Sequence, residues 1–375
     1  MFEHVLVIPA YKEDLSFIKR YFESSLARLN VLIILVINQP ETDENKQPQV
    51  QLHRNVLALG TKVWQQDNLS LLAIKQSNTQ ILLVDRFTFA IPVKQGVGLA
   101  RKVGCDLAAS LINQNLVQSP WIHSSDADTQ LPDDYFNAPQ HVEKNAVAGC
   151  YNFIHQSNDA VIDSANQQYE HALRYYVNGL RYAGSHYAFF TIGSILTFNV
   201  IAYAKVRGFP KRSAGEDFYL LNKLAKLGQV AFFEKTTLVI EARTSDRVPF
   251  GTGPAVSKII ALNAENKPYC YYHPDIFDLL KQALTAFKTL WGNLTTLDNW
   301  YAELPDSLVI IFKELDLHTF IDKHQTSTQG QFNKQLIVWF DAFKTLKFIH
   351  SARDHFYPDI ALDKAIAMSS FSHNR

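Results

Sequence analysis

The sequence predicts an α/β protein with a mixed, mainly parallel central sheet flanked by helices and a helical C-terminal extension. Three observations support this fold class. Short apolar runs alternate with helical patterns through residues 1–130, the order that right-handed strand–helix–strand units produce. The runs are continuously apolar, as strands covered on both faces are. From about residue 275 onward, apolar side chains instead recur at three- and four-residue spacing, which is typical of helices.

The first half of the chain supplies four candidates for buried strands, at residues 5–8, 31–37, 81–84 and 120–123. Helical patterns over 14–29 and 99–112 lie between them, and the polar segment 38–49 is predicted to be a loop. Ligands of such sheets bind at the carboxyl ends of the strands. The polar segments that follow the strands are therefore expected to meet in one crevice.

We predict a domain boundary near residue 255, with an α/β domain over 1–255 and a mostly helical extension over 256–375. Residues 150–255 are richer in aromatic side chains and less regular. Within the extension, helices are predicted over 276–291, 305–322 and 332–349. These helices carry no recognisable chemistry, so packing or partner binding is their default role. They are candidates for homo-oligomer contacts.

Composition excludes several classes of protein. The chain has 375 residues with 36 Lys+Arg and 36 Asp+Glu, so its formal net charge is zero; a nucleic-acid-binding surface usually needs a basic excess. Three widely spaced cysteines argue against a disulfide scaffold or zinc ribbon and suit a reducing compartment. No N-terminal apolar run approaches the roughly 20 residues of a membrane span. We expect a soluble, cytoplasmic protein without transmembrane segments.

The motif Asp126-Ala127-Asp128 directly follows the fourth predicted strand. In an extended or tightly turned segment, carboxylates at positions i and i+2 can address one point. Hard cations such as Mg²⁺ or Mn²⁺ prefer oxygen ligands and keep positions open for phosphate. The alternative is a solvated acidic loop that caps the next helix.

A second acidic pair, Glu216-Asp217, opens an amphipathic helical pattern after Gly215. Acidic residues in a first helical turn stabilise the helix dipole, which is sufficient reason for their presence. The functional reading makes one carboxylate a general base that accepts a proton from a substrate hydroxyl. Local sequence does not separate these readings.

Two further segments could bind phosphate. Gly98 opens a helical pattern that carries Arg101 and Lys102, and a glycine-rich helix entry with cations suits a phosphate or nucleotide. Arg243 and Arg247 follow a predicted strand and could clamp a diphosphate as it leaves. In each case a solvated basic surface is the alternative.

Taken in chain order, five segments resemble the motifs of family 2 glycosyltransferases. The resemblance covers about residues 4–255, and the order and spacing of the motifs make it jointly specific. The segments are Val7-Ile8-Pro9-Ala10-Tyr11-Lys12-Glu13, Gly98 to Gly104, Ser125-Asp126-Ala127-Asp128, Gly193-Ser194 to Gly208-Phe209-Pro210, and Gly215-Glu216-Asp217-Phe218.

The resemblance implies a GT-A (Rossmann-like) fold with a nucleotide-binding half over 1–130 and an acceptor-binding half over 131–255. It also implies a nucleotide-diphosphate sugar donor, a divalent cation (Mg²⁺ or Mn²⁺), and a small-molecule or glycan acceptor. Asp217 would be the catalytic base and Glu216 would help to place the acceptor. Asp126 and Asp128 would address the metal, and Arg243 with Arg247 would form the diphosphate loop. The donor-nucleotide residues would be Pro9, Ala10, Tyr11, Glu13, Asn38, Gly98, Arg101, Lys102, Asp126 and Ala127.

The sequence also departs from the family pattern. Lys12 stands where asparagine is usual, and Asn38 where an aspartate often contacts the base, which leaves the donor base open. The signature of processive synthases is absent after Asp217, so we expect a non-processive hexosyltransferase. The stereochemical outcome stays open. A nucleotidyltransferase of similar fold and a non-catalytic nucleotide-sugar-binding relative remain as alternatives.

Overall fold

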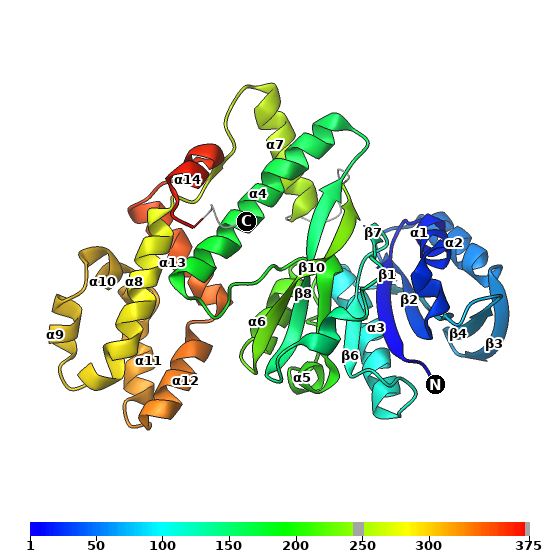
Figure 1. Ribbon diagram of the computed structural model, residues 1–375, viewed down its shortest axis with the longest axis horizontal. Coiled ribbons are helices and arrows are strands. Elements are labelled where there is room, and N and C mark those ends of the chain that lie inside the picture. The colour runs from blue at the N-terminus through cyan, green and yellow to red at the C-terminus, as the bar shows by residue number, and fades with distance from the viewer. Residues whose placement is uncertain (243–250, 372–375) are drawn as a thin grey trace. The chain divides into compact units, whose positions relative to one another are not determined.

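The computed structural model describes residues 1–242 and 251–371 and divides into two compact units (Figure 1). The first unit combines Met1–Asn166 with Thr191–Pro254, and the second combines Gln167–Phe190 with Ala255–Arg375. The predicted division into a nucleotide-binding half, an acceptor-binding half and an extension stays a prediction.

The first unit is built on a ten-stranded sheet in the order β3-β4-β5-β2-β1-β6-β9-β8-β10-β7. The longest registers, β1–β2, β2–β5 and β8–β10, are parallel, whereas β9 runs antiparallel to both of its neighbours. The mixed, mainly parallel sheet predicted from the sequence is therefore confirmed. The strands are β1 (His4–Ala10), β2 (Val31–Pro40), β3 (Gly60–Gln66), β4 (Leu69–Ile74), β5 (Gln80–Ile91), β6 (Trp121–Ser124), β7 (Thr129–Gln130), β8 (Ala146–Gln156), β9 (Leu196–Asn199) and β10 (Gln229–Glu241).

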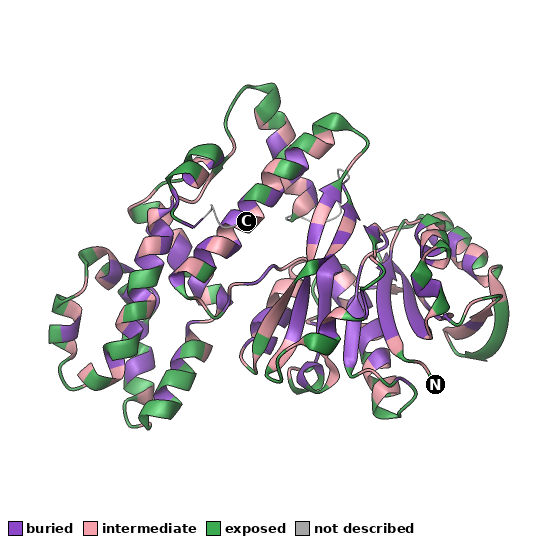
Figure 2. Cartoon of the chain, viewed as in Figure 1, coloured by how far each residue is buried: buried purple, intermediate pink, exposed green. Residues whose placement is uncertain are grey.

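Burial along the strands follows their position in the sheet (Figure 2). The central strands β1 and β2 are almost wholly buried, because helices cover both of their faces. The edge strand β3 is almost wholly exposed. The helices of the first unit are α1 (Ser16–Glu23), α2 (Gln47–Leu57), α3 (Gly96–Asn113), the start of α4 (Ala160–Ala183), α5 (Val200–Lys205) and α6 (Glu216–Leu224).

The second unit is mainly helical and is packed around aromatic side chains such as Phe277, Phe312, Phe332 and Phe348, all fully buried. None of the described helices is both long enough and apolar enough to cross a bilayer. The elements that follow α4 in this unit are α7 (Thr252–Ala264), β11 (Cys270–Tyr271), α8 (Asp275–Leu290), α9 (Leu297–Ala302), α10 (Asp306–Glu314), α11 (Leu317–His324), α12 (Gln329–Trp339), α13 (Ala342–His355), β12 (Ile360–Ala361) and α14 (Leu362–Met368).

Two of the helices predicted for the C-terminal region are each a pair of helices. The prediction over 305–322 is divided between α10 and α11 by Asp316, whose φ of 58° lies in the left-handed region. The prediction over 332–349 is divided between α12 and α13 at Asp341, whose side chain accepts hydrogen bonds from the amides of Phe343 and Lys344. Apolar spacing continues across both breaks, so periodicity alone could not reveal them.

Three other expectations also need correction. The helix predicted over 14–29 ends at Glu23 and is followed by a 3₁₀ turn. The loop predicted over 38–49 begins as strand, because β2 continues to Pro40, and α2 starts at Gln47. The segment 150–255, expected to be less regular, contains the long strands β8 and β10 and the 24-residue helix α4. The sequence reading also missed the β3–β4 hairpin, whose first strand, β3, is almost wholly exposed and has no apolar face.

Helix α3 approaches the sheet closely at Gly104. A Cβ placed on Gly104 would lie 2.4 Å from Val7 Cγ1 and 3.1 Å from Val36 Cγ2. We expect Gly104→Ala to lower the free energy of unfolding by about 1–3 kcal/mol through overpacking. Chemical denaturation measures this change. The loss in the Gly104→Ala/Val7→Ala double variant should be smaller than the sum of the two single losses, because the two changes share one contact.

Gly330→Ala is the matched control, since no atom lies within 4 Å of its added Cβ. Equal unfolding free energies for Gly104→Ala and the wild type would contradict the close approach of α3 to the sheet.

Candidate functional site

The turn that carries Asp126 and Asp128, here the acidic turn, lies at the carboxyl end of β6. Three backbone hydrogen bonds fix its course. The amide of Ser125 donates to Val7 O (3.1 Å), that of Thr129 to Asp126 O (3.2 Å), and that of Glu241 to Asp128 O (2.8 Å). These bonds tie the turn to β1 and to the end of β10. Asp126 and Asp128 are both half-buried, so their carboxylates remain partly accessible.

Helix α3 brings a buried arginine to this turn. The helix entry is held by the amide of Gly98, which donates to Arg212 O (2.9 Å). A Cβ on Gly98 would lie 2.5 Å from Pro210 O, so only glycine allows this approach of two backbones. Arg101 then projects from the second turn of α3, with its side chain 3% exposed.

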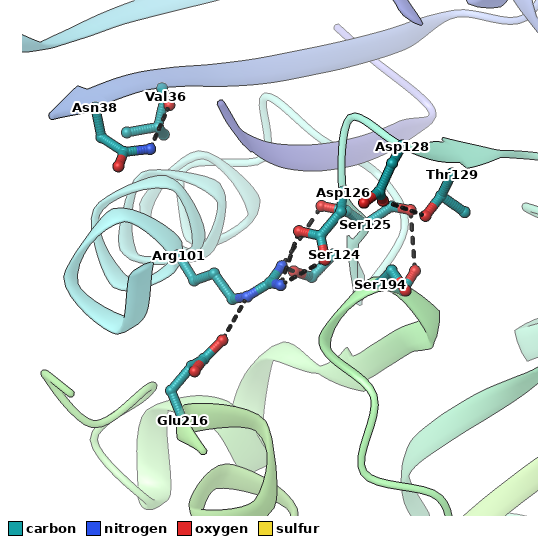
Figure 3. Close-up of polar contacts among 10 residues, drawn as sticks. All are labelled: Val36, Asn38, Arg101, Ser124, Ser125, Asp126, Asp128, Thr129, Ser194 and Glu216. Atoms are coloured by element: carbon teal, nitrogen blue, oxygen red, sulfur yellow. Dashed lines mark hydrogen bonds and ion pairs between the residues drawn. The ribbon is translucent and has the colours of Figure 1, made fainter. Parts of the chain in front are cut away.

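Arg101 joins the two acidic motifs (Figure 3). Its Nη2 donates to both carboxylate oxygens of Asp126, at 2.8 and 2.9 Å, and its Nε donates to Glu216 Oε1 at 3.0 Å. Its Nη1 donates to Ser124 Oγ at 3.2 Å. Burial alone would lower the pKa of Arg101, but the charges of Asp126 and Glu216 raise it above its ordinary value. The guanidinium therefore stays charged.

The second acidic motif starts α6. Gly215 adopts a φ of 70°, a left-handed conformation suited to glycine, and Glu216 is buried against Arg101. Burial and the neighbouring charge of Glu216 raise the pKa of Asp217 to about 7, although the amide of Phe218 and the charge of Arg101 oppose the shift. A carboxyl that titrates near neutrality is suited to accept a proton.

A separate polar cluster follows β1. Tyr11 donates its hydroxyl proton to Asp43 Oδ2 (2.5 Å), and Lys12 forms an ion pair with the same oxygen (2.9 Å). The Tyr11 hydroxyl and Lys12 lower the pKa of Asp43 to about 2. Lys12 has a φ of 54°, a conformation that asparagine tolerates better than lysine. Pro9 and Ala10 are the last two residues of the buried strand β1.

Not every predicted residue lies at the acidic centre. Lys102 points elsewhere: its Nζ pairs with Asp106 (2.9 Å) and donates to Arg207 O (3.1 Å). Ala127 is buried and its carbonyl accepts from Arg20. Glu13 is half-buried in the turn after β1. The predicted diphosphate residues Arg243 and Arg247 lie outside the described residues. Asn38 lies near the end of β2.

The carboxylates at this site offer few protein ligands for a divalent cation. Within the described residues, no group of three or more His, Cys, Asp or Glu side chains could hold a metal ion. Both oxygens of Asp126 are engaged by Arg101, and the Thr129 hydroxyl donates to Asp128 Oδ1 at 3.4 Å. The half-buried carboxylate of Asp128 fits as a single protein ligand to a cation whose other ligands come from phosphate and water.

The sequence reading missed residues that position the acidic turn and Arg101. Ser125 Oγ donates to Ser194 O (2.9 Å), which ties the turn to the segment before β9. A Cβ on Gly193 would lie 2.3 Å from Arg101 Nη2, so the guanidinium occupies the space beside this glycine. The sequence pointed to these positions only indirectly, because Gly193 and Ser194 belong to one of the motifs that resemble the family.

Comparison with known proteins gives weak likenesses. No family model matches the chain, and no curated protein matches its sequence. Staphylococcus aureus TarS residues 1–349, solved with UDP-GlcNAc, has 8% identity and a TM-score of 0.40, covering 94% of this chain and 91% of its own. The mannosyltransferase PcManGT of Pyrobaculum calidifontis, solved with GDP-Man and Mn²⁺, has 14% identity and a TM-score of 0.41, covering 92% and 87%. At these TM-scores neither likeness carries an assignment of activity.

The ion pairs of Arg101 with Asp126 and Glu216, here the arginine clamp, lead to a stability prediction. Arg101→Met leaves Glu216 buried without its cation, and breaking a buried ion pair in this way costs about 3–5 kcal/mol. Urea denaturation should therefore show a large loss of unfolding free energy. Lys102→Met, the adjacent cation in a more exposed pair, should cost less than about 1 kcal/mol. Equal losses for both variants would mean that Arg101 does not hold the two motifs together.

Proposed function

We propose that this protein is a glycosyltransferase of GT-A type that resembles family 2. It would transfer a sugar from a nucleotide-diphosphate donor to an acceptor hydroxyl on a small molecule or glycan. Asp217 is the proposed base, and a divalent cation is required. The acidic turn after β6 would bind the donor diphosphate, and the first turn of α6 would bind the acceptor.

The observation that carries the proposal is the bridging of two acidic motifs by Arg101. This single buried cation bonds Asp126 on the donor side and Glu216 on the acceptor side. Asp217, the next residue, has a pKa raised to about 7 by burial and by the charge of Glu216. Two acidic sites at one sheet edge, one of them with a carboxyl that titrates near neutrality, match a transfer that needs both a charged leaving group and a base.

The proposed chemistry needs one base. The Asp217 carboxylate accepts the proton of the acceptor hydroxyl. At the same time the oxygen of that hydroxyl forms a bond to the anomeric carbon of the sugar. The bond between that carbon and the diphosphate oxygen breaks, and the nucleoside diphosphate leaves with the electron pair. Glu216 is held by Arg101, so it orients the acceptor side and does not accept the proton. The stereochemistry of transfer is left to experiment.

Asp128 is the proposed protein ligand of Mg²⁺ or Mn²⁺. The cation would neutralise charge on the departing diphosphate. Asp126 acts through Arg101, which keeps its carboxylate at a fixed place beside Asp128.

A panel of nucleotide-diphosphate sugars incubated with Mn²⁺ tests this function. We expect release of nucleoside diphosphate from at least one donor, accelerated by a suitable acceptor and lost with a chelator. Asp128→Asn should weaken metal-dependent donor binding. Release of pyrophosphate would instead identify a nucleotidyltransferase. Donor binding without any release across the panel would identify a non-catalytic relative.

The pH dependence of transfer tests Asp217. Because the active form is the carboxylate, kcat/KM should rise with pH through about 7 and then level off. Asp217→Asn should reduce transfer about a hundredfold and leave donor affinity unchanged. Glu234→Gln, which removes an exposed carboxylate, is the control and should keep full activity. Wild-type turnover in Asp217→Asn would remove this residue from the mechanism.

The pH dependence of the unfolding free energy is a second test of Asp217. Its folded-state pKa lies above the ordinary 3.8, so folding favours the protonated carboxyl. This contribution is complete below about pH 4 and is lost as the pH rises through about 7. Asp217→Asn should remove that pH dependence of the unfolding free energy.

A further inference from the structure

The chain from α5 to the end of α6 carries many cations and few acids. Residues 200–228 contain six lysine or arginine side chains and two carboxylates, and one of the carboxylates, Glu216, is buried against Arg101. Four of the cations are exposed and form no ion pair with any described residue: Lys205, Arg207, Lys211 and Arg212. In a chain without net charge, this segment therefore has a local excess of positive charge.

The segment between α5 and α6 follows one face of α3. The amide of Gly98 donates to Arg212 O (2.9 Å), and Lys102 Nζ donates to Arg207 O (3.1 Å). Gly98 and Lys102 are four residues apart on a helix, so they share a face. Residues 207–212 therefore pass along this face toward the N-terminus of α3.

Lys223 of α6 lies at the same place. Its Nζ donates to Val206 O (3.4 Å), the carbonyl next to the one that Lys102 bonds. Burial and, after it, the charge of Lys102 lower the pKa of Lys223, which agrees with their proximity. Asp106 pairs with Lys102 (2.9 Å) and neutralises one charge. The cations that these contacts bring together, here the cationic strip, are Lys102, Arg207, Lys211, Arg212 and Lys223.

The cationic strip ends beside the proposed base. The guanidinium carbon of Arg212 lies 4.0 Å from the centroid of the Tyr219 ring. Tyr219 is in the first turn of α6, two residues after Asp217. Stacking on a ring orients a guanidinium and leaves its N–H edges available for a planar anion. The side-chain N–H groups of Arg212 have no acceptor among the described residues, so this oriented cation is exposed at the proposed acceptor site.

We propose that the cationic strip binds the acceptor, and that the acceptor carries phosphate or carboxylate groups near the hydroxyl that Asp217 deprotonates. Guanidinium groups bind the oxygens of both anions in pairs, and a row of exposed cations raises the local concentration of an anionic substrate. The contact of Arg212 with α6 favours an acceptor over an anionic membrane surface, because membrane binding does not require cations beside the base. This inference rests on the proposed function and specifies the charge of its acceptor.

Matched neutral and anionic acceptors test the proposal, with the full chain, Mn²⁺ and a donor that the nucleotide-sugar panel identifies. The pairs are glycerol with glycerol 1-phosphate and galactose with galacturonate. The anionic member should have a kcat/KM about tenfold higher or more, because charge-assisted hydrogen bonds are stronger than neutral ones. This advantage should shrink as salt rises from about 0.05 to about 0.5 M, since salt screens exposed charges.

A binding measurement that needs no acceptor connects this preference to the strip. Inorganic tripolyphosphate is the probe, and divalent cations are omitted because the proposed donor site needs one. Calorimetry should show about tenfold weaker binding for Lys211→Gln/Arg212→Gln than for the wild type. Arg54→Gln/Lys75→Gln is the matched control, because it removes two exposed cations elsewhere, and it should bind as the wild type does. Arg212→Lys keeps the charge without the planar group and should lose part of the affinity.

The outcomes separate this inference from the proposed function. Release of nucleoside diphosphate with equal kcat/KM for both members of each pair keeps the function and overturns the inference, as does equal tripolyphosphate affinity in the wild type and the double strip variant. If no member of any pair is glycosylated, the tripolyphosphate comparison decides. Strip-dependent binding to phosphatidylglycerol but not phosphatidylcholine vesicles, without a preference for anionic acceptors, would assign the strip to a membrane and overturn the inference. Failure of every nucleotide sugar to bind overturns the proposed function and the acceptor assignment with it.

Discussion

The buried guanidinium of Arg101 is the interaction on which the candidate site depends. It comes from α3 and contacts residues from two distant segments, the turn after β6 and the start of α6. Two carboxylates this close would repel each other and be costly to bury without a cation between them. With Arg101 present, both keep defined positions. Burial, and after it the charge of the neighbouring Glu216, raises the pKa of Asp217 in the same arrangement.

Three glycines, which have no side chain, allow the close contacts that position Arg101 between the two acidic motifs. Gly98 lets the start of α3 touch the backbone before α6, and Gly193 leaves space for the guanidinium itself. Gly104 brings the middle of α3 onto the buried strands β1 and β2. Three separate glycines thus set the depth and direction from which one arginine reaches the acidic motifs. A larger residue at Gly98 would press on backbone atoms, whereas one at Gly104 or Gly193 would meet the side chain of Val7 or of Arg101.

Polar side chains of β2 and β5 are divided between the two faces of the sheet. Asn38 and its register partner Arg86 lie on the α3 side. On the opposite face, α2 contributes Gln49, whose amide bonds Gln39 (2.7 Å). Alternation along β2 therefore places the neighbouring polar side chains of Asn38 and Gln39 on opposite faces of the sheet.

The sequence by itself determined the sheet-and-helix alternation and the position of the acidic pairs, because continuous apolar runs and helical spacing are local signals. It indicated Asp126, Asp128, Glu216 and Asp217 for the same reason, since their motifs are short and contiguous. It could not locate the breaks inside the C-terminal helices, across which apolar spacing continues, or the β3–β4 hairpin, whose first strand is exposed and shows no apolar alternation. Only the tertiary structure decided that Arg101 rather than Lys102 joins the motifs, and that Arg86 lies beside Asn38. Both facts depend on strand register and helix packing, which relate residues far apart in the chain and leave no pattern in either segment alone.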